Sequence, residues 1–169
     1  MADTGFKTTG AVVSTGTWSN FTTTRINTAD NSRATTAAGA FDAATINNFS
    51  FGLSSGVTID GIEVNTEFSN VLGTATATLQ ISLSWNNGTN YTATKSDTVT
   101  STTDKNSTLG GATDTWGRTW TDTEFANGTF LVKVEGKTTV GGTCRLDFFQ
   151  IKVYYTVAAT SGFFLLMGA

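Results

Sequence analysis

The stretch LQISLSWNNGTNYTAT, residues 79–94, decides the fold class of this protein. Its first half alternates apolar and polar side chains, with Leu79, Ile81 and Leu83 on one side, which is the period of a half-buried β-strand. The Asn87–Gly88 pair that follows tolerates the positive φ angles of a tight hairpin turn. The stretch therefore predicts two antiparallel strands joined at this turn.

Similar short patterns occur on both sides of the hairpin. We expect further strands at residues 11–17, 33–38, 49–53, 59–68, 97–103, 130–134 and 144–156. A loop is expected at residues 104–114 around two glycines, and the capping-box sequence TDTE at residues 121–124 predicts one helical turn. Eight or nine short strands separated by turns predict an all-β protein, an antiparallel β-sandwich with a jelly-roll-like arrangement.

Two positions interrupt the alternation and predict local irregularities in the strands. Gly61 lies at a change of phase between flanking isoleucines, which is typical of a bulge or kink. In the last strand the apolar phase changes between Phe148 and Phe149. A bulge there, or burial of both faces of the strand, would account for the change.

The composition supports a sheet protein of one domain. The 169 residues include 36 threonines and 13 serines, whereas only 14% of residues are charged. Threonine is β-branched and favours extended backbone, so long helices are not expected. We expect a short N-terminal arm at residues 1–13, the sandwich at residues 14–157, and an apolar C-terminal arm at residues 158–169.

Several classes of function are excluded or disfavoured. The chain has no histidine, which excludes serine-histidine-aspartate triads, histidine metal sites and imidazole proton shuttles. A net charge of -3 with only ten lysines and arginines argues against binding to nucleic acid. No apolar run is long enough to span a membrane, and no secretory signal is present. We therefore expect a soluble protein without catalysis, cofactor or metal, although carboxylate, lysine or tyrosine chemistry stays open.

The segment LGGATDTWGRTW contains the clearest candidate for a binding site. Trp116 and Trp120 lie close in sequence to Asp114, and Asp122 and Glu124 follow. Flat aromatic rings beside carboxylate acceptors are typical of carbohydrate sites, so Trp116, Trp120 and Asp114 are possible glycan contacts.

The same residues have a structural interpretation, which we favour. Tryptophan rings of this size can close one end of a small core, and Arg118 would then neutralise a neighbouring carboxylate. Hydrolysis of a glycoside would need two carboxyl groups held about 5 to 9 Å apart in a cleft, which the sequence does not establish.

The end of the chain suggests a contact with another protein. Five consecutive apolar residues would be an aggregation hazard if they were left in water. We expect this segment to be an assembly interface, formed by Phe163, Phe164, Leu165, Leu166 and Met167.

A set of motifs resembles a β-sandwich module of tailed-phage and prophage virion structural proteins. These motifs are GTWSN at 16–20, DNSRAT at 30–35, FSFGL at 49–53, VTIDGIEV at 57–64, LGGATDTWGRTW at 109–120 and LDFFQIKVYYT at 146–156.

The resemblance implies a non-enzymatic virion protein, most readily a capsid decoration or cement protein. It would be assembled in the host cytoplasm as a homo-oligomer such as a trimer, with capsid or other virion proteins as partners. The alternative is a carbohydrate- or receptor-binding module of a phage tail or fibre.

Overall fold

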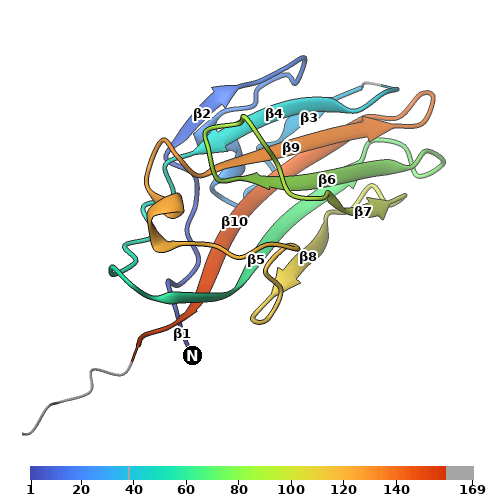
Figure 1. Cartoon of the computed structure of the whole chain (residues 1–169). Helices are drawn as coiled ribbons and strands as arrows, with labels where there is room; N and C mark the ends of the chain where they lie inside the picture. Colours follow the sequence, from blue (N-terminus) through green and yellow to red (C-terminus); the bar gives the residue numbers. More distant parts are fainter. Residues whose placement is uncertain (38, 159–169) are drawn as a thin grey trace, which may run out of the picture.

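Two antiparallel sheets packed face to face form the described part of the chain, which is residues 1–37 and 39–158 of a computed structural model (Figure 1). The first sheet has the order β1 (Ala2–Asp3), β10 (Cys144–Thr156), β5 (Thr58–Asn70) and β8 (Lys105–Gly111), and β3 (Ala34–Thr36) also pairs with β10. The second sheet has the order β2 (Ala11–Ser14), β4 (Asp42–Asn47), β9 (Leu131–Thr138), β6 (Ala77–Ser84) and β7 (Lys95–Val99). The predicted all-β antiparallel sandwich is confirmed.

The predicted hairpin is present, but its second strand begins later than expected. Strand β6 pairs with β7 from Ala77 opposite Val99 to Ile81 opposite Lys95. The chain reverses through Asn87 and Gly88, whose φ angles are 52° and 84°. Residues 91–94 were expected to form the second strand of the hairpin. They lie instead in the loop between β6 and β7.

Residues 49–53 bury the expected side chains without forming a strand. Phe49 and Phe51 are both buried, yet β4 ends before them. The residues that flank and separate them, Asn48, Ser50 and Gly52, have positive φ angles of 61°, 53° and 69°. This backbone preserves the two-residue period of burial while it breaks the hydrogen-bonded ladder, so the strand assignment was wrong and the core assignment correct.

The expected loop at residues 104–114 was also wrong for most of its length. Strand β8 pairs with β5 from Lys105 opposite Phe68 to Gly111 opposite Ile62. Because β8 is an edge strand with mostly polar side chains, it lacks the apolar alternation by which strands are recognised.

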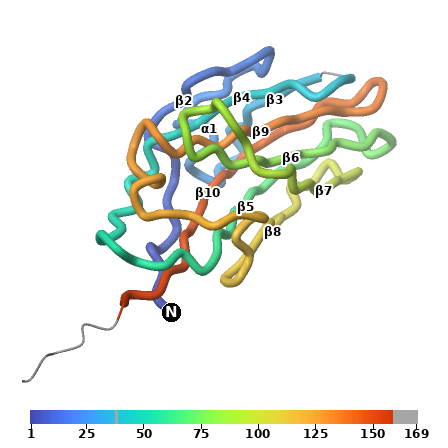
Figure 2. Tube along the Cα trace, in the orientation of Figure 1, coloured from blue at the N-terminus to red at the C-terminus, as the bar shows by residue number. Residues whose placement is uncertain are grey.

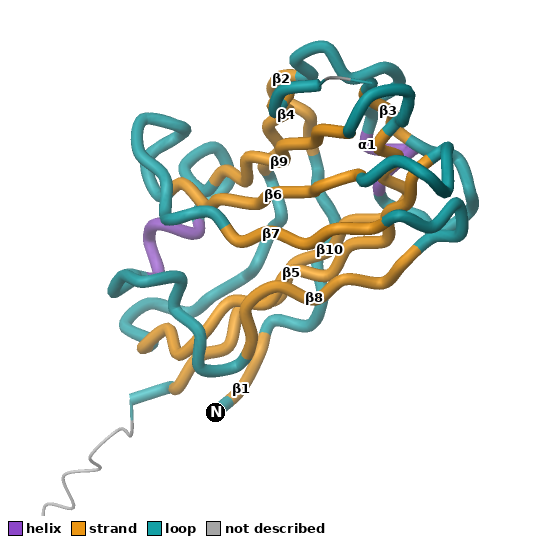
Figure 3. Tube along the Cα trace, turned by 90° about the vertical axis from the view of Figure 1, so that its right-hand side faces the viewer, coloured by secondary structure: helices purple, strands orange, loops and turns teal. Residues whose placement is uncertain are grey.

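Two short helices lie on opposite sides of the view in Figure 3. The predicted capping box is present at the 3-10 helix η1 (Asp122–Phe125), where the Thr121 N–H donates to Glu124 Oε2 at 2.8 Å. The four-residue helix α1 (Thr23–Ile26) was not predicted, since its threonines favour strands.

Both irregularities predicted in the long strands coincide with bulges between β5 and β10. One bulge leaves Asp60, next to Gly61, without an opposite residue on β10. The other leaves Asp147 without an opposite residue on β5, one residue before the expected change of phase. As a result, Phe149 is fully buried, whereas Phe148 stays half-buried on the outer face of the first sheet.

Residues 1–13 are part of the sandwich and not the arm that was expected. Ala2 pairs with Tyr155, and Lys7 forms a bridge with Ile151, so the start of the chain lies along β10 (Figure 2). From Ala11 the chain joins the other sheet as β2. Within the described residues, no helix has the length and apolar character needed to cross a membrane.

A tryptophan ring packs directly against the backbone of β9 in the core between the sheets. A Cβ atom placed on Gly136 of β9 would lie 2.4 Å from the ring of Trp18 and 2.9 Å from Thr36 Cγ2. Trp18 is buried and donates from Nε1 to the Asp42 carbonyl at 3.0 Å. Glycine is therefore required at residue 136 because the indole ring occupies the space of a side chain.

Candidate functional site

The two tryptophans predicted as possible glycan contacts lie inside the sandwich. Trp116 and Trp120 are 3% and 4% exposed. Their indole N–H groups donate to the Ile62 carbonyl at 2.9 Å and to the Thr115 carbonyl at 2.7 Å. Neither ring offers a free face to a sugar in this structure, so the packing favours their structural interpretation.

Asp114 is engaged in local contacts. Its carboxylate accepts from the Trp116 N–H at 2.9 Å and pairs with the Lys95 ammonium group at 2.8 Å. Burial acts to raise the pKa of Asp114, but these hydrogen bonds and the charge of Lys95 outweigh it and hold the pKa below its usual value. Asp114 therefore stays ionised and fixes the turn before Trp116.

Arg118 connects the tryptophans to the helix η1. Its guanidinium carbon lies 4.0 Å from the ring centroid of Trp85 and 4.3 Å from that of Trp120, so the cation is held between two rings. The same guanidinium donates to Glu124 Oε1 at 2.8 Å. The sequence predicted that Arg118 would neutralise a carboxylate, and this is confirmed. The contribution of Trp85 was missed, because it comes from the distant β6–β7 loop.

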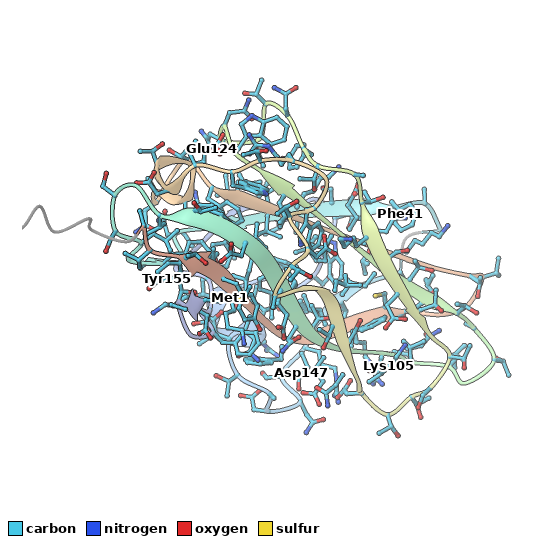
Figure 4. The ribbon with its side chains drawn as sticks, turned by 60° about the horizontal axis from the view of Figure 1, so that its bottom comes forward. Met1, Phe41, Lys105, Glu124, Asp147 and Tyr155 are labelled. Atoms are coloured by element: carbon cyan, nitrogen blue, oxygen red, sulfur yellow. The ribbon has the colours of Figure 1, made fainter. Side chains whose placement is uncertain are left out.

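A hollow of about 560 Å³ opens beside this cluster, between residues 50–55 and residues 122–127. We call it the end hollow. Its walls combine aromatic and aliphatic side chains with hydroxyl, amide and carboxylate groups, among them Ser50, Phe51, Leu53, Asp122, Phe125 and Asn127. Figure 4 marks its neighbour Glu124 on the η1 turn, at the opposite edge of the view from Asp147.

Cross-links hold the two walls of the end hollow in place. The Asn127 amide accepts from the Ser50 N–H at 3.0 Å and donates to the Ser50 hydroxyl at 3.1 Å. Asp122 Oδ2 accepts from the Gly56 N–H at 3.3 Å. These contacts join segments more than sixty residues apart, so the hollow is formed before any ligand arrives.

The apolar wall of the end hollow rests on the predicted tryptophan cluster. The ring of Phe125 lies 5.5 Å from that of Phe51 and 5.2 Å from that of Trp120, measured between centroids. Trp120 thus supports the wall from behind, without touching the open space itself. Asp122 was noted in the sequence, whereas Ser50 and Asn127 carried no local signal that would bring them together.

Other chemistry has little support in the described residues. No group of three or more carboxylate, cysteine or histidine side chains within residues 1–37 and 39–158 could hold a metal ion. Burial raises the pKa of the Cys144 thiol to about 12, so it is not a thiolate nucleophile at neutral pH. The predicted assembly residues Phe163, Phe164, Leu165, Leu166 and Met167 lie outside the described residues.

Comparisons with known proteins find carbohydrate-binding modules among solved structures. No family model and no curated protein matches this chain. The xylan-binding domain CBM22-1 of Xyn10C from Paenibacillus barcinonensis matches at 14% identity with a TM-score of 0.44, over 92% of this chain and 97% of that one. TmCBM61, solved in complex with β-1,4-galactotriose, matches at 14% identity with a TM-score of 0.36, over 70% of this chain and 68% of that one.

Proposed function

We propose that this protein is a non-catalytic β-sandwich module that binds a neutral oligosaccharide in the end hollow. The observation that carries the proposal is the end hollow itself, about 560 Å³ in volume, with apolar side chains beside hydrogen-bonding ones. A sugar ring presents apolar C–H faces and a rim of hydroxyl groups, and such a pocket can satisfy both.

The polar side of the end hollow fits hydroxyl groups better than a charged ligand. The hydroxyls of Ser50, Ser55 and Thr123 and the amide of Asn127 both donate and accept hydrogen bonds. Asp122 adds a carboxylate, which accepts strongly from a hydroxyl and repels an anion. The net charge of -3 also disfavours anionic polymers.

The arrangement of acids supports binding without hydrolysis. Glycosidases generally use two carboxyl groups on either side of the bond to be cleaved. Among the described residues, only Asp122 brings a carboxylate into the lining of the end hollow. The Glu124 carboxylate nearby accepts from Arg118 and from the Thr121 N–H, which lowers its pKa although burial acts to raise it. Glu124 is therefore held as an anion and is unsuited to act as a general acid.

Calorimetric titration with β-1,4-galactotriose, xylohexaose, cellohexaose and the acidic trimer of galacturonic acid tests the proposal. We expect binding of a neutral probe, with Asp122→Ala and Ser55→Ala each weakening it about 3- to 10-fold through a lost hydrogen bond. Asp30→Ala, an exposed carboxylate outside the end hollow, is the matched control and should leave the Kd unchanged. Absence of binding to every neutral probe, or equal effects of Asp122→Ala and Asp30→Ala, would refute the proposal.

A second proposal is the virion assembly role implied by the phage resemblance, with capsid or other virion proteins as partners. The exposed aliphatic residues Val71, Leu72 and Val140 support it, with exposures of 43%, 43% and 103%. They lie in the β5–β6 and β9–β10 connections and could add apolar contacts between subunits. Light scattering should detect an oligomer that Leu72→Ser and Val140→Ser weaken, and a monomer at high concentration would count against self-assembly.

A further inference from the structure

The outer face of the first sheet carries a second group of hydrogen-bonding side chains, separate from the end hollow. Register places Gln150, Asn65 and Thr108 side by side across β10, β5 and β8. In the next outward-facing row, Phe148 is followed by Glu67 and Asn106. Figure 4 turns this sheet toward the viewer.

This face is hollowed where the two rows meet. A depression of about 180 Å³ is lined by Asn65, Asn106, Thr108, Phe148 and Gln150, among others. We call it the face hollow. One half-buried aromatic ring therefore borders a space whose other walls are amide and hydroxyl side chains, and Glu67 lies between Phe148 and Asn106 in the adjoining row.

Among the residues that line the face hollow, Asn65, Thr66 and Ser107 each have a buried side-chain oxygen without a hydrogen-bond partner in the described structure, and of these Asn65 lies on the outer face of the sheet. Asn65 Oδ1 is buried and accepts no hydrogen bond from any described residue. A buried acceptor without a donor destabilises a fold, and the middle of a strand favours β-branched residues over asparagine. Local violations of this kind concentrate at functional positions, where a ligand supplies the missing partner.

We infer that the face hollow is a second binding site for one ring of a neutral sugar, with Asn65 as its central acceptor. A ligand hydroxyl donates to Asn65 Oδ1, while the amides of Gln150 and Asn106 bond the neighbouring hydroxyls. The ring of Phe148 contacts the apolar face of the sugar. The inference rests on the proposed carbohydrate-binding function and adds a second, independent site to it.

Two-dimensional ¹H–¹⁵N NMR of the full chain can observe the two sites separately. Xylohexaose, cellohexaose and β-1,4-galactotriose are each titrated while the side-chain amide signals of Asn65, Gln150 and Asn127 are followed. We expect Asn65 and Gln150 to shift together with one midpoint, and Asn127 to shift with another. In Asp122→Ala, which alters only the end hollow, the Asn65 shifts should persist unchanged.

Asn65→Val distinguishes a ligand-binding residue from a structural one. The substitution removes the unpaired acceptor and improves the strand, so Tm should rise by a few degrees while the face-hollow midpoint weakens at least 10-fold. Gln150→Ala should also weaken this midpoint, whereas Gln80→Ala, on the outer face of the second sheet, is the matched control and should not.

The outcomes separate the two proposals. Shifts at Asn127 alone would support the end hollow and overturn the face hollow. Shifts at Asn65 alone would overturn the end hollow and retain the face hollow. A fall in Tm for Asn65→Val, or an unchanged midpoint in that variant, would show that Asn65 serves the fold and not a ligand.

Discussion

Replacing Arg118 tests whether the cation held between two tryptophans stabilises the end of the sandwich. Its guanidinium carbon lies 4.0 Å and 4.3 Å from the two ring centroids, of Trp85 and Trp120. Two cation–π contacts at a partly buried site contribute about 1 to 2 kcal/mol together. The partly buried ion pair with Glu124, at 2.8 Å, adds about 1 kcal/mol. Arg118→Ala should therefore destabilise the fold by about 2 to 3 kcal/mol.

Thermal unfolding followed by circular dichroism measures this effect. For a domain of this length, the loss corresponds to a fall in Tm of roughly 4 to 12 °C. Arg25→Ala is the control, because Arg25 makes no ion pair or ring contact in the described structure. Arg118→Lys retains the charge but loses the flat contact with the two rings, so its Tm should lie between those of Arg118→Ala and Arg25→Ala. A Tm for Arg118→Ala within 1 °C of that of Arg25→Ala would refute this account of the cluster.

Three further predictions address the core and the acid limit of stability. Trp120→Ala should destabilise by about 3 to 5 kcal/mol in urea unfolding, and a change below 1 kcal/mol would contradict its place in the core. Gly136→Ala should lower Tm strongly, whereas Gly39→Ala, where a Cβ meets nothing within 4 Å, should not. Burial acts to raise the pKa of Asp104, but hydrogen bonds and the charge of Arg33 lower it below its usual value. Because the folded pKa lies below the unfolded one, this stabilisation is complete above about pH 4 and is lost as pH falls through the folded value. Asp104→Asn should therefore flatten the decline of Tm in acid, and an unchanged acid slope would contradict the ion pair.

Strands with one buried face could be predicted from the sequence in detail. The bounds of β10 match the predicted residues 144–156, because its apolar residues alternate around a single bulge. The same reasoning failed for residues 49–53, where left-handed residues imitate the period of a strand. It also failed for β8, whose polar outer face belongs to the proposed face hollow. A two-residue hydrophobic period predicts which side chains are buried. Those residues form a strand only where the backbone stays extended.

The candidate site was only partly accessible from the sequence. The segment containing Trp116 and Trp120 does lead to the end hollow, but the tryptophans support its wall from inside. The rim depends on Ser50 and Asn127, which are 77 residues apart and meet only through the tertiary fold. Such pairs of ordinary polar residues have no local pattern, so a single sequence does not identify them.

Strand β10 has a consequence for the order in which the protein can fold as it leaves the ribosome. It pairs with β5 on one edge and with β1, β3 and the bridges of Lys7 and Asn27 on the other. All of these partners are synthesised long before β10, so they must wait for it while exposing unpaired edges. The second sheet waits in the same way, because one edge of β4 stays unpaired until β9 is made and Asn47 pairs with Leu131. Closing loops of more than 70 residues is entropically costly in both sheets, so refolding should be slow and the sandwich should be complete only after β9 and β10 have docked.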